Sequence, residues 1–273
     1  MNLVLQGPGA AASTAAHLAQ LTRSTGIEPV NAAFRLRDAQ RADIDRYCAE
    51  KRIDYAWMPA GRRFGELKLL AMDMDSTLIT IECIDELGDF AGKKAEVAAI
   101  TAQAMRGELD YPASLRKRVS VLQGLPDSIL SRVYEERLCL TPGAEELIHA
   151  CKANGVKLLL VSGGFTFFTD RLKQRLGIDY TISNTLEVRN GKLTGHVLGD
   201  IVDAAAKAAK FREVLKSLGS KEQSVAIGDG ANDLKMMAEA GVSVAFRAKP
   251  VVRAQATCAL NFSGLDAVIN LFE

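Results

Sequence analysis

The sequence lacks several features on which common classes of protein depend. Its five cysteines are scattered and form no Cys-x-x-Cys pair, so neither a zinc site nor a disulfide framework is indicated. The 34 basic and 33 acidic residues leave a net charge of +1, which gives no electrostatic case for binding nucleic acid or an anionic membrane. No apolar run approaches the ~20 residues that cross a bilayer. We therefore expect no nucleic-acid and no membrane partner.

Motifs of other enzyme and targeting classes are missing as well. Residues 1–7 have neither the basic region nor the long apolar stretch of a signal peptide, which favours a location in the reduced cytoplasm. No Gly-x-x-x-x-Gly-Lys-Ser/Thr loop is present, so a P-loop kinase is disfavoured. The three histidines lie outside the polar loops described below, which disfavours a histidine-based phosphatase. Gly7–Ala12 superficially matches a dinucleotide-binding fingerprint, but its unit is too short for such a domain.

What the sequence does contain is an ordinary globular composition, with 48% hydrophobic and 25% charged residues over 273 positions. Residues 1–66 predict a small α/β region of about two strands and two helices, whose own core is marginal and which we expect to pack on the rest. Residues 82–140 carry apolar side chains at helical spacing and predict a helical insert. Residues 67–81 and 141–273 alternate strands and helices, which predicts an α/β core with a Rossmann-like, doubly wound parallel sheet.

The most informative signal is a pair of acidic residues directly after a predicted strand. Lys68–Met72 is a short apolar run, and Asp73 and Asp75 follow it two positions apart. Two carboxylates this close repel each other, and they persist together where a cation neutralises them or where one stays protonated. The pair therefore indicates either a Mg²⁺ site or a nucleophile beside an acid.

Two further polar loops follow predicted strands. Ser162-Gly163-Gly164 offers a hydroxyl and unobstructed backbone N–H groups, which can hold phosphate oxygens. Gly228–Asp233 contains two more carboxylates, the hard oxygen ligands that suit Mg²⁺. Because the carboxyl ends of parallel strands lie at one edge of a sheet, we expect the three loops to form one site.

Two basic residues are candidates for the same site. Arg118 falls within the apolar stripe of the helical segment 114–123, and an inward-facing arginine needs an anionic partner. That partner is either a substrate carboxylate or Glu82, at the start of the insert, and the alternative is that the guanidinium extends to solvent. Lys207 begins a helix among alanines and can supply a cation where charge builds on a phosphoryl group, with Lys210 as its competitor.

Together these residues resemble the haloacid dehalogenase (HAD) superfamily of phosphotransferases. The superfamily's four motifs match, in order, Asp73-x-Asp75-x-Thr77, Ser162, Lys207 and Gly228–Asp233. The phosphoserine phosphatases within it are more similar still, through Glu82, Ser114–Val119, Val161–Phe165 and Asn190–Gly195. The likeness covers about residues 67–270, and it makes the helical insert similar to the small cap that this family carries after its first motif.

The resemblance implies a role for each matching residue. Asp73 would be the nucleophile that becomes an aspartyl phosphate, and Asp75 would protonate the leaving serine oxygen and later deprotonate water. The phosphate would be held by Ser162, Gly163 and Lys207, with Asn232 orienting the phosphate loop.

The same resemblance implies a metal site and a substrate pocket. Mg²⁺ would be bound by Asp73, Asp229 and the main-chain carbonyl of Asp75, with Asp233 acting through water. The pocket would use Glu82 for the substrate ammonium and Arg118 for its carboxylate, with Met105 and Tyr111 as walls. Tyr111 stands where the family often has phenylalanine.

These expectations amount to a Mg²⁺-dependent phosphatase that hydrolyses O-phospho-L-serine in the last step of serine biosynthesis. The alternatives are a phosphatase of another small phosphomonoester and a catalytically idle amino-acid sensor. Many relatives carry an amino-acid-binding module of the ACT type upstream, so residues 1–66 are interpreted as a possible remnant of one. Whether the protein is a monomer or a homodimer stays open.

Overall fold

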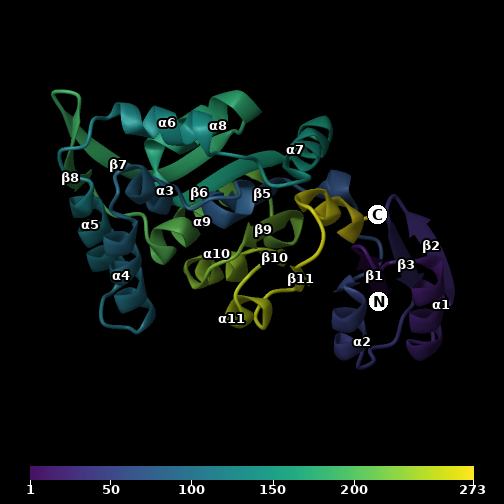
Figure 1. Ribbon diagram of the computed structural model, residues 1–273. Helices are drawn as coiled ribbons and strands as arrows, with labels where there is room; N and C mark the ends of the chain where they lie inside the picture. The colour runs from purple at the N-terminus through teal and green to yellow at the C-terminus, as the bar shows by residue number, and fades with distance from the viewer.

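The computed structural model describes all 273 residues, which form two sheets surrounded by helices (Figure 1). The strands of the larger sheet are β5 (Leu69–Asp73), β6 (Lys157–Phe165), β7 (Tyr180–Arg189), β8 (Lys192–Leu198), β9 (Ser224–Gly228), β10 (Val242–Phe246) and β11 (Cys258–Leu260). They lie in the order β11-β10-β9-β5-β6-β7-β8. All neighbours pair in parallel except β7 and β8, which form an antiparallel hairpin.

Helices cover both faces of this sheet. One face packs against α7 (Ala144–Ala153), α8 (Thr166–Leu176) and the C-terminal 3-10 segment η5 (Leu265–Leu271). The other packs against α9 (Ala204–Leu218), α10 (Leu234–Glu239) and α11 (Pro250–Arg253). Strands buried on both faces appear in a sequence as continuous apolar runs, which is why the core strands are predictable. The predicted α/β class with a doubly wound sheet is confirmed.

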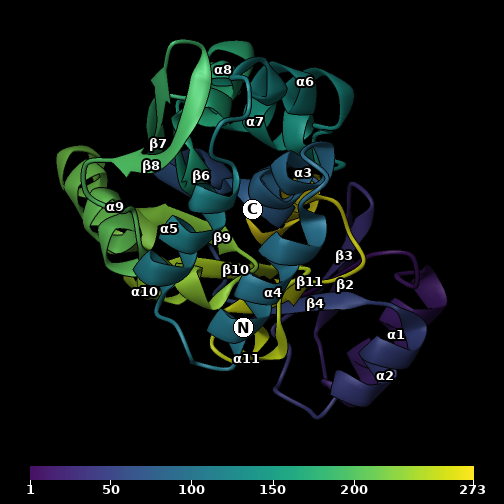
Figure 2. The ribbon, with the colours of Figure 1, turned by 60° about the vertical axis from the view of Figure 1, so that its left-hand side comes forward.

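The helical insert leaves the sheet after β5 and returns before α7. Its helices are α3 (Cys83–Phe90), α4 (Lys94–Met105), α5 (Tyr111–Val121) and α6 (Ser128–Glu136). The outgoing and returning linkers lie side by side, since Ile79 and Leu140 form an antiparallel bridge and the Thr141 N–H donates to the Leu78 carbonyl at 3.0 Å. In Figure 2, α4 and α5 come forward of the large sheet.

The N-terminal region forms a second, antiparallel sheet. Its elements are β1 (Asn2–Gln6), α1 (Ala12–Leu21), β2 (Gly26–Val30), β3 (Ala33–Arg37), α2 (Asp45–Lys51) and β4 (Asp54–Met58). The strand order is β2-β3-β1-β4. The sheet has two strands more than the sequence predicted: β4, and β2, which is half exposed and contains Pro29.

This small sheet is tied closely to the larger unit. One of its faces packs on its own helices, while Val4, Ala56 and Met58 join the main core, as expected for a region whose own core is marginal. The Asp54 carboxylate accepts three backbone N–H groups of residues 261–263, at 2.7 to 3.0 Å. The buried Arg35 donates to two carbonyls of the C-terminal segment. Both chain ends therefore meet at this junction (Figure 1).

Two smaller observations complete the fold. The last strand, β11, has three residues and is too short to give a recognisable pattern in the sequence. No helix has both the length and the hydropathy that crossing a membrane requires.

Candidate active site

The two acids of the first loop have different surroundings. Asp73 is the last residue of β5 and is 4% exposed. The chain then turns through Ser76, whose φ of 56° takes it off the strand direction. The Asp75 carboxylate accepts the Cys83 N–H at 2.8 Å and the Ser162 hydroxyl at 3.2 Å. Burial raises the pKa of Asp75, against the lowering effect of its hydrogen bonds with Cys83 and Ser162.

Lys207 reaches the acids from the first turn of α9. The helix begins at the N-cap Asp203, whose carboxylate accepts two backbone N–H groups. The Lys207 ammonium is 2.5 Å from Asp73 Oδ1 and 2.8 Å from Asp233 Oδ1, with all three side chains buried. Burial alone would lower the pKa of Lys207, but Asp233 and Asp73 raise it, so the lysine stays charged. Its competitor Lys210 pairs with Glu213 at the surface.

Asp73, Asp229 and Asp233 form a compact acidic cluster, with one oxygen from each lying within 4.8 Å of the others. Burial and then Asp233 raise the pKa of Asp73 well above its usual range, and the same two causes raise the pKa of Asp229 to about 6. Three carboxylates against one ammonium leave negative charge uncompensated. Because all the donors are hard oxygens, this cluster fits a divalent cation such as Mg²⁺.

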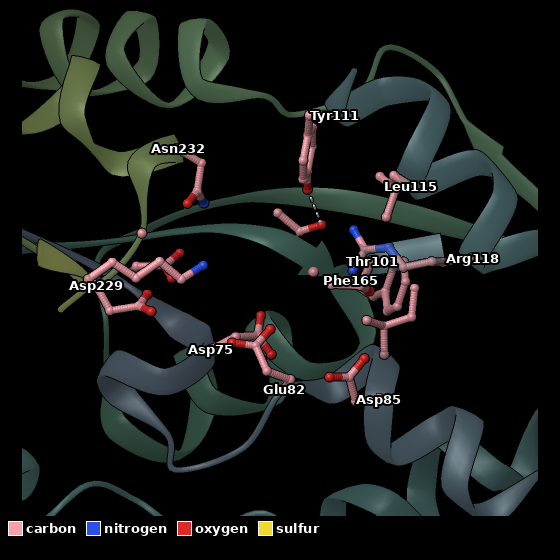
Figure 3. A pocket seen from close by; sticks show the side chains of 16 residues that line it. Asp75, Glu82, Asp85, Thr101, Tyr111, Leu115, Arg118, Phe165, Asp229 and Asn232 are labelled. Carbon is pink, nitrogen blue, oxygen red and sulfur yellow. Dashed lines mark hydrogen bonds between the residues drawn. The ribbon is translucent and has the colours of Figure 1, made fainter. Parts of the chain in front are cut away.

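The second loop is held by donors from two sides. The Gly163 carbonyl accepts the Asn184 amide at 2.8 Å and the Tyr111 hydroxyl at 2.9 Å (Figure 3). A Cβ on residue 163 would lie 2.2 Å from the Tyr111 oxygen, so any larger residue there would push the Tyr111 side chain away from the loop. The Gly164 N–H donates to the Ser162 hydroxyl at 2.8 Å. The loop is therefore set both from the sheet and from the helical insert.

A cavity of about 350 Å³ opens between these loops and the insert. At one end lie Asp229 and Asn232, and at the other Arg118 with Leu115 and Thr101 (Figure 3). This volume suits a small ligand. A ligand here would meet acidic groups at the sheet end, with Lys207 buried behind them, and a guanidinium at the insert end.

Arg118 and Glu82 line the insert end of the cavity without pairing. The structure contains no ion pair between them, and Arg118 Nε is buried without a hydrogen-bond partner. Glu82 accepts the Ser76 hydroxyl at 2.7 Å instead. The protein packed around Glu82, together with Asp75, raises the pKa of Glu82 to about 7. Each residue thus offers an unmet charge or donor to a ligand.

The structure brings most predicted site residues to this cavity, but not all. Ser162, Lys207 and Asp233 lie just beneath its lining, fully or almost fully buried. Met105 does not reach it, because it ends α4 with 73% of its surface exposed. The remaining predicted residues line the cavity: Asp73, Asp75, Glu82, Tyr111, Arg118, Gly163, Asp229 and Asn232.

Several residues of the site carried no sequence signal. Asn184 is 1% exposed within β7, and besides holding Gly163 it accepts the Val202 N–H, two residues before the α9 helix begins to form. Asp85 and Thr101 line the cavity but belong to no recognised motif. Lys249 also lines it, and only its position shortly after the end of β10, at the same sheet edge, could have indicated it.

Comparisons with known proteins agree with this geometry. A family model described as haloacid dehalogenase-like hydrolase matches residues 70–238. A phosphoserine phosphatase from Albidiferax ferrireducens is 55% identical over 217 residues, which cover 77% of this chain and 92% of that protein. The unliganded structure of a probable phosphoserine phosphatase from Vibrio cholerae has a TM-score of 0.84 at 38% identity, covering 99% of this chain and 85% of that one. A phosphoserine phosphatase solved as a phospho-aspartyl intermediate analogue has a TM-score of 0.71 at 39% identity, covering 76% and 99%.

Proposed function

The chain belongs to the haloacid dehalogenase-like hydrolases, and we propose that within them it is a phosphoserine phosphatase, hydrolysing O-phospho-L-serine to L-serine and phosphate. The observation that carries this substrate is Arg118, whose guanidinium has an unpartnered buried nitrogen at the insert end of the cavity. A substrate with a phosphate at one end and a carboxylate at the other satisfies both ends of the cavity.

The reaction proceeds in two steps. In the first, an Asp73 oxygen attacks phosphorus, the bond to the serine oxygen breaks, and Asp75 gives that oxygen a proton. In the second, Asp75 takes a proton from water, whose oxygen attacks the aspartyl phosphate and releases phosphate and free Asp73. The raised pKa of Asp75 supports its role as an acid, and the phospho-aspartyl analogue in a relative supports the covalent step.

The phosphate is held by groups that already lie around Asp73. Lys207 contacts Asp73 directly, so its charge lies where negative charge develops during transfer. The Ser162 hydroxyl and the Gly163 loop supply hydrogen-bond donors, and Asn232 lines the same end of the cavity. These roles follow from position and charge.

A metal ion is implied by the family and by the acidic cluster, and we propose that it is Mg²⁺. Asp73, Asp229 and the main-chain carbonyl of Asp75 would hold it, with Asp233 acting through water. When bound, it masks negative charge so that a carboxylate can approach a phosphate dianion. Lys207 alone does not neutralise the three carboxylates of the cluster, which supports a second cation there.

The insert recognises the amino-acid part of the substrate. Arg118 binds the carboxylate and Glu82 the ammonium, whose positive charge would lower the raised pKa of Glu82 and keep it ionised. Tyr111 forms a wall beside the phosphate loop. Met105 is proposed as a second wall, which requires α4 to move toward the cavity, because the side chain is exposed in this structure.

We also propose a division of the chain into residues 1–66, a cap of residues 82–140, and a catalytic core of residues 67–81 and 141–273. The strand-helix-strand-strand-helix-strand order of the first region supports its interpretation as an ACT-like unit. The enzyme would act in the cytoplasm, in the last step of serine biosynthesis. Five free cysteines, four of them buried, support a reduced environment.

The test is phosphate release from L-phosphoserine with Mg²⁺, beside phosphothreonine, glycerol phosphate and a sugar phosphate. Wild type is compared with Asp73→Asn and Arg118→Ala. We expect a strong preference for phosphoserine that Arg118→Ala removes, and no release by Asp73→Asn. Activity on another ester alone would overturn the substrate, and no Asp73-dependent release from any ester would favour an amino-acid sensor.

A further inference from the structure

One helix, α5, contributes three of the seven insert residues that line the cavity. Tyr111, Leu115 and Arg118 all belong to α5 and all line it. The place of the Arg118 guanidinium therefore depends on how α5 is held relative to the sheet. The position of the guanidinium matters because small displacements of a group that binds the substrate change the reaction rate strongly.

The N-terminal end of α5 is fastened to the phosphate loop. The Tyr111 hydroxyl donates to the Gly163 carbonyl at 2.9 Å, and the absence of a Cβ at residue 163 permits this approach. The helix itself begins at Asp110, whose carboxylate accepts the Ala113 N–H at 2.7 Å. The first turn of α5 is thus fixed in direction and in contact with the core.

The C-terminal end of α5 is fastened to the β7–β8 hairpin. Three backbone hydrogen bonds join the hairpin to the segment after the helix: Gly124 N–H to Leu193 carbonyl, Leu193 N–H to Leu125 carbonyl, and Asp127 N–H to Gly191 carbonyl, at 2.8 to 3.0 Å. Such bonds hold two pieces of backbone in register. The hairpin is anchored in turn, because β7 pairs with β6 in the large sheet.

Gly195 lets the hairpin lie directly on the last turn of α5. A Cβ at this position would be 3.0 Å from the Gln123 Cβ and 3.3 Å from the Ser120 Cα. Gly191, in the turn of the same hairpin, has nothing within 4 Å of its Cβ position. The two glycines share a positive φ, +84° and +71°, and differ in this contact.

The neighbouring helix α4 lacks comparable fastenings. Val97 is its one buried residue, Met105 at its end is largely exposed, and no hydrogen bond joins α4 to the large sheet or its loops. The closest tie is the Lys93 ammonium, just before α4, which donates to the Val121 carbonyl of α5. The double attachment of α5 is therefore a specific feature of that helix.

We infer that the β7–β8 hairpin is a positioning element for substrate recognition: by seating Gly195 on α5, it holds Arg118 where the substrate carboxylate binds. The identity of the ligand group rests on the proposed function, while the attachment of α5 does not. Gly195 touches no substrate and acts through α5. The hairpin thereby contributes to specificity from outside the cavity, since neither Gly191 nor Gly195 lines it.

The test compares Gly195→Ala with Gly191→Ala. Both variants carry the strain of a positive φ, but only the Gly195→Ala side chain also meets α5 and displaces it. For Gly195→Ala we expect the KM for phosphoserine to rise roughly tenfold, with the inhibition constant of inorganic phosphate within about twofold of wild type. Inorganic phosphate serves as the probe that needs the core groups and not Arg118.

Hydrogen exchange of the α5 amides, measured without substrate, gives a second readout. We expect faster exchange in Gly195→Ala than in Gly191→Ala. Equal KM values and equal exchange in the two variants would overturn the inference, as would a parallel loss of phosphoserine and phosphate binding. If wild type hydrolyses a different ester, the proposed substrate fails, while the exchange comparison still decides whether Gly195 holds α5.

Discussion

The two ends of the cavity differ in how their charges are satisfied. At the sheet end, Lys207 is already paired with Asp73 and Asp233, and all three are buried. At the insert end, Arg118 has no ion-pair partner and Glu82 keeps only a hydroxyl partner. The groups that transfer phosphate must already be in place before the substrate binds. Groups that select a substrate contribute most to binding when their charges and hydrogen bonds are satisfied only by the ligand.

This difference assigns separate consequences to the two ends. Substitutions at the sheet end should abolish phosphate transfer from every ester. They should also lower the stability of the fold, because buried charges lose their partners. Damage at the insert end should change which ester is preferred and leave transfer to water intact. The variants below test that separation.

The largest effect is expected for the nucleophile. Asp73→Asn keeps the size of the side chain but removes the attacking oxygen's charge, so activity should fall by at least about 10⁴-fold for every ester. Phosphate release with phosphoserine and glycerol phosphate measures it. A variant that retains activity on one of the two would mean that another group attacks phosphorus.

Lys207→Ala should combine loss of activity with loss of stability. It leaves the buried carboxylates of Asp73 and Asp233 without their shared ammonium, which costs about 3–5 kcal/mol in comparable buried pairs. Lys210→Ala is the matched control on the same helix, and its exposed pair with Glu213 is worth about 0–1 kcal/mol. Urea unfolding without metal compares the two, and equal midpoints would contradict the role of Lys207 in balancing the acids.

Arg118→Ala should act on recognition alone. Loss of charged hydrogen bonds to a carboxylate, worth about 1.5–3 kcal/mol, predicts a fall in kcat/KM for phosphoserine of roughly 10- to 100-fold. Inhibition by inorganic phosphate should stay near wild type. Arg116→Ala, at an exposed site of the same helix, is the control. An equal loss of kcat/KM in both variants would mean that the net charge of the protein, and not the position of Arg118, causes the effect. Weaker inhibition by inorganic phosphate in Arg118→Ala would mean that Arg118 also binds the phosphate.

The same contrast explains what the sequence predicted well. The sheet end is built from three loops that each follow an apolar strand, so the positions of Asp73, Ser162 and Asp229 in the sequence predict that they lie in the site. The core strands β5, β6, β9 and β10 are likewise continuous apolar runs. Local pattern and sheet geometry are sufficient there, because the site follows from the order of strands.

Other parts depend on contacts that no local pattern contains. Asn184 looks like an ordinary strand residue, and only the fold places its amide between Gly163 and Val202. The strand β2, with Pro29 and a half-exposed face, gives little signal by itself and forms because β3 pairs with it. Met105 was expected at the cavity by resemblance alone, and its placement depends on how α4 packs.

The smallest effect tests the unpaired acid at the insert end through the pH dependence of stability. The pKa of Glu82 is about 7 in the folded protein, against an ordinary value near 4.5. Between these values the folded state binds more protons than the unfolded state, so stability falls as pH rises through this window. Glu82→Gln has no proton to lose, so its free energy of unfolding should match that of wild type near pH 4 and exceed it near pH 8.

Since Glu82 is exposed to solvent in the open cavity, we expect a difference in the free energy of unfolding of only about 1 kcal/mol, measured by urea unfolding without metal or substrate. A wild type that is equally or more stable than Glu82→Gln at pH 8 would mean that Glu82 has a partner in the free enzyme, and the contrast between a paired sheet end and an unpaired insert end would fail at this residue.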